Sequence, residues 1–316
     1  MTPLVIIAGP TAVGKSDIAV KLAKKINGSI ISADSMQVYK GMDIGSAKIT
    51  PDEMQGVKHY LIDVLDPHED FNVALFKSMT EKAYADILSE GKIPIIAGGT
   101  GFYIQSFLYD INFNESVGEL SDYRKELEAL YEEKGADFLY DMLKEKDPVS
   151  AGIIHKNNVK RVIRALEFYK ETGRPISEHN ELEHEKPSAY NSAFFVLTDE
   201  RSRLYEKIDR RVDLMLENGL IEEVKGLRDM GLKKTDISMQ GLGYKEILSY
   251  LEGECSLEDA VYLIKRDSRH FAKRQITWFK REKNVLWINK PDFDYDDERI
   301  LDYMYSECLL REIIKS

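Results

Sequence analysis

Hydrophobic residues follow two alternating patterns over the first hundred positions. Short apolar runs predict buried strands, and stretches with apolar residues three and four positions apart predict amphipathic helices. Strands are expected at residues 4–8, 30–32, 60–62 and 93–97, and helices at 15–26 and 71–88, with glycines 98, 99 and 101 opening a further helix. Strands that alternate with helices are typical of a parallel sheet with right-handed crossovers.

The pattern changes near Asn112. Residues 119–186 are charged and helical with no buried strand, and residues 178–191 are expected to form a linker or mobile loop. A strand signal returns at 193–198, helices dominate 201–281, and a last strand is predicted at 285–288. We therefore expect an α/β fold: a P-loop NTPase-like parallel-sheet core formed by residues 1–112 and 193–316, interrupted by a mainly helical insertion domain at 113–192.

Composition narrows the class of protein. The chain has 316 residues, 43% of them hydrophobic, and only two cysteines, Cys255 and Cys308, with no CxxC pair. Neither a disulfide framework nor a zinc site is predicted, and no targeting or membrane-spanning segment is evident. A soluble cytoplasmic protein is expected. Its net charge of -11 means that any nucleic-acid surface must be a local basic stripe.

The strongest local motif is GPTAVGKS, which follows the first apolar run and precedes a helix. It matches the complete Walker A pattern, in which backbone N–H groups, a lysine and the helix N-terminus hold phosphate and a hydroxyl suits Mg²⁺. The predicted phosphate site comprises Gly9, Pro10, Thr11, Ala12, Val13, Gly14, Lys15 and Ser16, with Ser16 as the metal ligand. Bound polyphosphate is predicted, but the motif leaves the chemistry open.

A carboxylate at the end of a neighbouring strand would complete such a site. Asp34 follows the run SIISA and Asp63 follows HYLI. Asp34 is the better candidate because Ser35, Gln37 and other polar residues share its loop, at the sheet edge where α/β proteins bind ligands. For Asp63, a turn-capping role is equally compatible with the sequence.

Seven motifs in order resemble one known family. GPTAVGKS, ISADSMQVYKGMDIGSAK, HYLIDVLDP, AGGTGFY, IHKNNVKRVIRALE, QGLGYKE and AKRQITWFKR together are similar to the bacterial tRNA dimethylallyltransferases of the tRNA isopentenyltransferase family. The resemblance runs from Pro3 to about Ile288. It implies transfer of the dimethylallyl group from dimethylallyl diphosphate to the exocyclic amine of the adenosine 3′-adjacent to the anticodon in tRNA, with release of diphosphate.

The resemblance also implies roles for individual residues. Asp34 would be the general base, Thr100 would contact the target nucleotide, and Arg211 would reach the diphosphate, with Mg²⁺ as cofactor. A helix-capping role for Thr100 and a surface ion pair of Arg211 with Asp209 or Asp213 are the alternatives. The tRNA contacts carried over from the family motifs are Asp34, Ser35, Met36, Gln37, Thr100, Tyr123, Arg124, Val159, Lys160, Arg161, Arg164, Gln240, Gly241, Gly243, Tyr244, Lys245, Arg269, Lys273 and Arg274.

Two basic segments could form the RNA surface. Residues 265–283 hold eight lysines and arginines against two acids, and at helical spacing Arg266, Arg269, His270 and Lys273 share a face. In residues 155–164 the sequence suggests that Lys156, Lys160, Arg161 and Arg164 face no acid. The segment from Gln240 to Lys245 combines glycines with Tyr244, a mixture suited to base stacking. The insertion is expected to hold the anticodon stem of a tRNA bound to a monomer.

Three other functions share part of this pattern. An adenylate isopentenyltransferase acting on free AMP, ADP or ATP would share the P-loop, Asp34 and Thr100, but would need neither the insertion nor the basic helix. A P-loop kinase and a non-catalytic RNA-binding module are the further alternatives. The intact set of Lys15, Ser16 and Asp34 fits the last of these poorly.

Overall fold

The computed structural model describes residues 2–111 and 122–315 and divides into two compact units. The core unit runs through Leu108 and resumes at Ala189, and the insertion unit spans Tyr109–Ser188. The sequence placed the insertion at 113–192; its first boundary lies outside the described residues. Each unit has its own apolar core, so the two are described separately.

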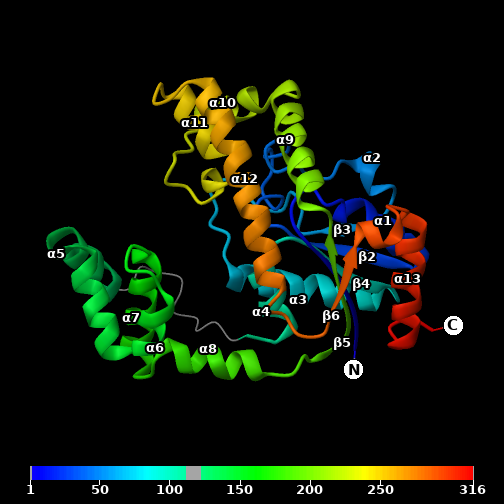
Figure 1. Cartoon of the computed structure of the whole chain (residues 1–316), viewed down its shortest axis with the longest axis horizontal. Coiled ribbons are helices and arrows are strands. Elements are labelled where there is room, and N and C mark those ends of the chain that lie inside the picture. The colour runs from blue at the N-terminus through cyan, green and yellow to red at the C-terminus, as the bar shows by residue number, and fades with distance from the viewer. Residues whose placement is uncertain (1, 112–121, 316) are drawn as a thin grey trace. The chain divides into compact units, whose positions relative to one another are not determined.

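A six-stranded parallel sheet forms the centre of the core unit (Figure 1). Its order is β3-β2-β4-β1-β5-β6, and every pair is parallel, as predicted. The strands are β1 (Thr2–Ala8), β2 (Gly28–Ala33), β3 (His59–Tyr60), β4 (Ile93–Gly98), β5 (Tyr190–Thr198) and β6 (Val285–Asn289). Pro94 is the second residue of β4, near a strand start, where a missing N–H is tolerated.

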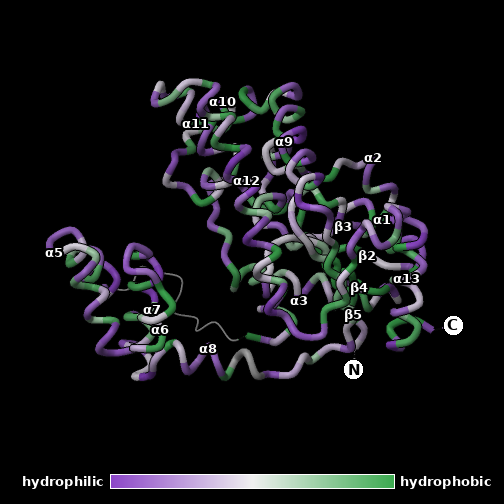
Figure 2. Tube along the Cα trace, viewed as in Figure 1, coloured by the Kyte–Doolittle hydropathy of each residue, from purple (hydrophilic) through white to green (hydrophobic). Residues whose placement is uncertain are grey.

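Helices cover both faces of the sheet. On one face, α1 (Lys15–Lys25), α9 (Arg201–Glu217) and α13 (Asp297–Leu310) pack against the side chains of Val5, Ile7 and Phe195. On the other face lie α3 (Val73–Ser89) and α4 (Gly101–Leu108). Figure 2 shows the strands as the most hydrophobic part of this unit. The sheet is therefore buried on both sides, which is typical of doubly wound α/β folds.

Helix α12 (Leu257–Phe279) runs alongside both α4 and α9. It is joined by α10 (Leu220–Asp229), the short helix η2 (Ser238–Gln240) and α11 (Tyr244–Leu251). The remaining short elements of the core unit are α2 (Pro51–Met54) and η3 (Lys290–Phe293). The described helices include none with the length and apolar character needed to cross a membrane.

The insertion unit is helical, as predicted. Its helices are α5 (Asp122–Lys146), α6 (Pro148–Ile153), α7 (Val159–Thr172) and α8 (Ile176–Glu185), and α5 contains a non-helical residue at Gly135. Leu127, Leu143, Val162 and Leu166 belong to its buried core. Amphipathic helices that bury one face against each other account for the absence of strand signals here.

The predicted loop at 178–191 is wrong. Residues up to Glu185 belong to α8, and β5 already begins at Tyr190. Asp147 fixes the start of α8, because its carboxylate accepts hydrogen bonds from the backbone N–H and hydroxyl of Ser177 at 3.0 and 2.7 Å. Charged residues such as glutamate are good helix formers, so a stretch with high charge and no apolar stripe can be helical.

Helix α13 was not predicted, although the sequence carries a signal for it. Ile300, Leu301, Met304 and Cys308 are buried at helical spacing. Asp296 caps the helix by accepting hydrogen bonds from the N–H groups of the first turn.

Candidate functional site

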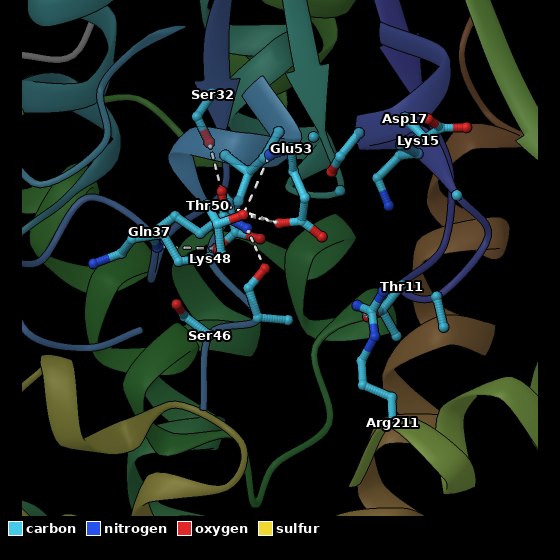
Figure 3. Close-up of a pocket in the computed structure, with 18 of the residues that line it drawn as sticks. Thr11, Lys15, Asp17, Ser32, Gln37, Ser46, Lys48, Thr50, Glu53 and Arg211 are labelled. Atoms are coloured by element: carbon cyan, nitrogen blue, oxygen red, sulfur yellow. Dashed lines mark hydrogen bonds between the residues drawn. The ribbon is translucent and has the colours of Figure 1, made fainter. Parts of the chain in front are cut away.

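A pocket of about 770 Å³ opens at the carboxyl ends of the strands. Its lining comes from the P-loop, the loop that follows β2, the end of β4, and helices α9 and α12. Figure 3 shows Lys15 and Arg211 on one side of the pocket, with Gln37, Lys48, Thr50 and Glu53 on the other. The pocket thus brings together the Walker A motif, Asp34 and Arg211, which lie far apart in the sequence.

The P-loop has the shape that its sequence predicts, between the end of β1 and the start of α1. At Gly9 (φ +147°), a Cβ would lie 2.5 Å from the Leu197 carbonyl oxygen of β5, so only glycine fits. Gly14 caps α1 with a left-handed conformation, Val13 is buried, and the Ser16 hydroxyl lies exposed at the helix start. The Lys15 ammonium donates to the Pro10 carbonyl oxygen at 2.7 Å. This leaves the N-terminus of α1 directed at the pocket.

Lys15 and Arg211 are like charges that are both half-buried in the pocket. Burial, and then the positive charge of Arg211, lower the pKa of Lys15 to about 7, against a smaller opposing effect of Asp34. Burial also lowers the pKa of Arg211. Among the described residues neither cation has an ion-pair partner, and the Arg211 guanidinium instead donates to the Thr11 hydroxyl at 3.5 Å. A bound anion would relieve this repulsion.

The alternative of a surface ion pair for Arg211 is wrong. Asp209 pairs with Arg269, and Asp213 pairs with Lys265. Both acids are thus engaged by cations of α12, while Arg211 points into the pocket (Figure 3).

Asp34 and Thr100 occupy neighbouring strand ends. One oxygen of Asp34, Oδ1, accepts hydrogen bonds from the N–H groups of Met36 at 2.9 Å and Gln37 at 3.4 Å. The backbone N–H of Thr100 donates to the Ala33 carbonyl oxygen at 3.2 Å, next to Asp34 in the chain. Neither Oδ2 of Asp34 nor the Thr100 hydroxyl has a hydrogen-bond partner within residues 2–111 or 122–315. Both groups therefore retain bonding capacity, and no capping hydrogen bond from Thr100 is seen.

The second acidic candidate, Asp63, is engaged elsewhere. It pairs with the buried ammonium group of Lys48, which also bonds to Asp43 and to the Tyr39 carbonyl oxygen. Asp63 is absent from the residues that line the pocket.

Two predicted RNA segments pack against each other. The Met36 side chain lies against Gly241, where a Cβ would come within 2.6 Å of it. Gly243 (φ +95°) begins α11, and Lys245 pairs with Glu246. Ser35 and Gln37 are half-buried in their loop, and the exposed Gln240 side chain bonds to the Lys234 carbonyl oxygen.

The stacking role suggested for Tyr244 is not supported. Its side chain is fully buried, and its ring lies where a Cβ on Gly45 would fall. Its hydroxyl donates to Glu223 at 2.8 Å, and burial together with this carboxylate raises the pKa of Tyr244. An aromatic ring beside glycines looks the same in sequence whether it packs inward or outward.

Glu223 was not identified from the sequence, yet it fixes one wall of the pocket. Its carboxylate accepts three consecutive backbone N–H groups, from Asp43 at 2.9 Å, Ile44 at 2.7 Å and Gly45 at 3.0 Å, in addition to the Tyr244 hydroxyl. Charge-assisted bonds of this kind are strong, so Glu223 holds the loop of residues 43–45 onto α10.

The cations of α12 fall into two groups. Lys265, Arg266 and Arg269 pair with Asp213, Asp267 and Asp209, so Arg269 is not a free RNA-facing cation as the helical projection suggested. Further along, the following exposed residues have no ion pair within the described chain: Lys273 and Arg274 on α12, and Lys280 and Arg281 just beyond its end. Arg274 lies over the ring of Phe271, with 5.7 Å between the guanidinium carbon and the ring centroid.

In the insertion unit, α7 begins at Val159 without a side-chain cap. Lys160, Arg161 and Arg164 have no ion pair within residues 122–188, whereas Lys156 pairs with Asp137 at 2.6 Å, contrary to the expectation that it faces no acid. Of the other predicted contacts in this unit, Tyr123 lies beneath the Lys170 ammonium, and Arg124 pairs with buried Glu167 at 3.4 Å.

The fold and pocket define an α/β protein with a P-loop whose pocket also contains a carboxylate, Asp34, whereas Thr100 is not among the lining residues and follows Gly99, which is. Comparison with known proteins gives the family. Residues 37–282 match the IPP transferase family. The chain belongs to this family of prenyl-transferring enzymes, so the predictions of family, fold class and enzyme class are confirmed. Membership argues against a P-loop kinase and a non-catalytic module.

Individual relatives agree with this assignment. The chain is 58% identical over 315 residues to the tRNA dimethylallyltransferase of Lachnoclostridium phytofermentans, covering all of both chains. It is similar to the crystal structure of the Bacillus halodurans tRNA isopentenylpyrophosphate transferase (44% identity, TM-score 0.74, 99% and 98% of the two chains covered). It is also similar to a eukaryotic dimethylallyltransferase acting on tRNA (30% identity, TM-score 0.84, 99% of this chain and 80% of the other).

The Glu223 clamp gives a first prediction. Replacing Glu223 with alanine leaves three N–H groups of the 43–45 loop without their acceptor, so this loop is expected to open more often. Amide hydrogen exchange of residues 43–45 should accelerate about ten-fold or more. Glu222→Ala, at the exposed neighbouring position, is the matched control and should leave exchange unchanged. Equal exchange in the two variants would contradict the clamp.

Proposed function

We propose that the protein transfers the dimethylallyl group from dimethylallyl diphosphate to the exocyclic amine of the adenosine 3′-adjacent to the anticodon in tRNA. The observation that carries the proposal is the unneutralised cation pair of Lys15 and Arg211 beside Asp34 in one pocket. It supports an anionic leaving group next to a carboxylate. The names of the related enzymes support tRNA as the acceptor.

The charges of the pocket suit the bond that must break. Cleavage of an allylic carbon–oxygen bond places negative charge on diphosphate and positive charge on the allyl group. Fixed donors aimed at the diphosphate stabilise the transition state more than the ground state. Lys15, Arg211 and the N–H groups at the start of α1 would supply these donors.

Asp34 would act as the general base. The lone pair of an exocyclic adenine amine is delocalised into the ring, so removal of its proton as the new bond forms assists attack. Hydrogen bonds from Met36 and Gln37 hold Oδ1, leaving Oδ2 for the amine proton. Thr100, at the adjoining strand end, has a hydroxyl available to orient the nucleotide.

Mg²⁺ fits this site through its phosphate ligands. Within the described residues, no three His, Cys, Asp or Glu side chains converge on a metal position. Mg²⁺ at phosphate sites commonly takes only one or two protein ligands and completes its coordination with phosphate oxygens and water. The exposed Ser16 hydroxyl would hold it, and the ion would neutralise charge on the departing diphosphate.

Cations outside the pocket would bind the RNA. Lys160, Arg161 and Arg164 on α7, and Lys273 and Arg274 on α12, are free of ion pairs in the described chain and are available to phosphates. Recognition of the anticodon stem by the insertion would rest on shape and backbone charge. The target base must leave its stack to reach Asp34, as in other enzymes that modify bases.

The choice of acceptor tests the proposal directly. Purified protein is incubated with Mg²⁺ and labelled dimethylallyl diphosphate, and offered either an anticodon stem-loop with a run of adenosines or free AMP. Label should enter the stem-loop and not AMP, because the nucleotide alone makes none of the contacts to α7 and α12. Label in AMP but not in RNA would favour an adenylate isopentenyltransferase instead.

A second prediction concerns the base. Asp34→Asn keeps an oxygen for the Met36 N–H but cannot take up a proton, so kcat for transfer should fall about 10²- to 10⁴-fold. Affinity for the stem-loop, measured by filter binding, should stay within about two-fold of wild type. Asp70→Asn, at an exposed position, serves as control. A parallel loss of RNA binding would make Asp34 a recognition residue.

Adjacent arginines offer a third test. Arg211→Gln removes one cation from the pocket, so affinity for inorganic diphosphate with Mg²⁺ should drop about ten- to a hundred-fold in calorimetry. Arg210, the exposed next residue on α9, provides the matched variant Arg210→Gln, with expected wild-type affinity. If both variants bind diphosphate equally, Arg211 does not contact it.

A further inference from the structure

One buried amide joins two loops of the pocket. Gln275 lies on the inner side of α12 with 6% of its surface exposed. Its Oε1 accepts the backbone N–H of Thr11 at 2.8 Å, and its Nε2 donates to the Gly99 carbonyl oxygen at 3.0 Å. Both polar atoms of the side chain are thus used, each on a different loop.

The fit around this amide is tight. A Cβ at Gly99 would lie 2.1 Å from Nε2 of Gln275, and one at Gly101 would lie 2.2 Å from the ring of Trp278, one helical turn further along α12. These two glycines of the AGGTG segment therefore let α12 approach the β4–α4 loop closely. The contacts leave no room for the loop to shift toward the helix.

The two loops that Gln275 joins carry different parts of the site. Thr11 belongs to the P-loop, and its hydroxyl accepts from Arg211. Gly99 immediately precedes Thr100. The N–H of Thr100 donates to the carbonyl oxygen of Ala33, which is next to Asp34 in the chain. A displacement of either loop would alter the spacing between the diphosphate donors and the groups that would hold the nucleotide.

We propose that Gln275 is a positioning residue for the transfer reaction, which sets the distance between the diphosphate loop and the loop carrying Thr100. This inference rests on the proposed function. Gln275 also lines the pocket, but both of its hydrogen bonds are to backbone groups, so we assign it an action through the loops that carry Thr11 and Thr100. Gln275 lies between Lys273 and Trp278 on α12, so its two hydrogen bonds also fix both loops to this helix. The outer side of the helix bears the cations that have no ion pair.

The bonding pattern demands an amide. One atom must accept from an N–H and the other must donate to a carbonyl, and glutamine does both in a fixed orientation. A glutamate of the same shape keeps the acceptor, but its ionised form places a carboxylate oxygen against the Gly99 carbonyl. The protonated form regains a donor, and burial beside a carbonyl raises the pKa of such a carboxyl group.

The test uses Gln275→Glu in the full-length protein with the stem-loop acceptor. At about pH 8 we expect kcat to fall about ten-fold or more, while KM for the stem-loop stays within about two-fold of wild type. The ratio of variant to wild-type kcat should then rise as the pH is lowered to about 6, because the glutamate side chain becomes a donor to Gly99. Lys15, whose pKa is lowered to about 7, is present in both proteins, so its own titration enters both terms of this ratio.

Thr277→Ala, at an exposed position on the same helix, is the matched control and should behave as wild type. A Gln275→Glu variant with wild-type kcat, or a ratio that does not change with pH, would overturn the proposal. If this variant does not fold, Gln275→Met, similar in size but without the amide, is assayed instead. Wild-type kcat together with wild-type diphosphate affinity in Gln275→Met would then refute the positioning role of Gln275.

Failure of the proposed function can be distinguished from failure of the positioning role. A wild-type protein that binds diphosphate but does not prenylate the stem-loop contradicts the transfer reaction, whatever Gln275 does. The positioning role is then judged from diphosphate affinity, which the loss of the Thr11 contact should reduce about ten-fold. Unchanged affinity in Gln275→Met would count against it.

Discussion

The repulsion between Lys15 and Arg211 is the constraint around which the pocket is arranged. Two half-buried cations in one pocket cost free energy unless a counter-charge is near, and Asp34 alone offsets the burial of Lys15 only in part. An anion bound at the proposed diphosphate site would therefore stabilise the protein.

The sheet supplies the position of this pair but not the reaction. A P-loop between β1 and α1 would serve a kinase equally well, since it recognises phosphate oxygens and nothing beyond them. This site differs from a kinase site in the residues at the neighbouring strand ends. There the Thr100 N–H donates to the carbonyl oxygen of Ala33, the residue before Asp34. A P-loop on one side and a carboxylate on the other would suit the displacement of diphosphate proposed above.

Sequence patterns predicted the parallel sheet and the P-loop because both depend on local order: apolar runs, helical spacing and glycines at fixed intervals. The same patterns did not predict the roles of residues whose partners are set by tertiary contacts. Glu223 and Gln275 are single polar residues within helices, and only the folded chain reveals that their partners are backbone groups some 180 and 264 positions away. Tyr244 was given an outward role because composition cannot indicate which side of a glycine turn is buried. The loop predicted at 178–191 is wrong because the later part of α8 carries charge without an apolar stripe.

Charge distribution reconciles an acidic protein with an RNA substrate. Acids on α9 neutralise Lys265 and Arg269 near the middle of α12, and Asp267 does the same for Arg266. The positive field is thereby confined to the later turns of the helix, around Lys273 and Arg274, on the same stretch from which Gln275 reaches the pocket. A uniformly basic helix would bind RNA in many registers. If Lys273 and Arg274 bind RNA as proposed, neutralising the other half of the helix would leave fewer registers, with phosphate held near the turn that carries Gln275.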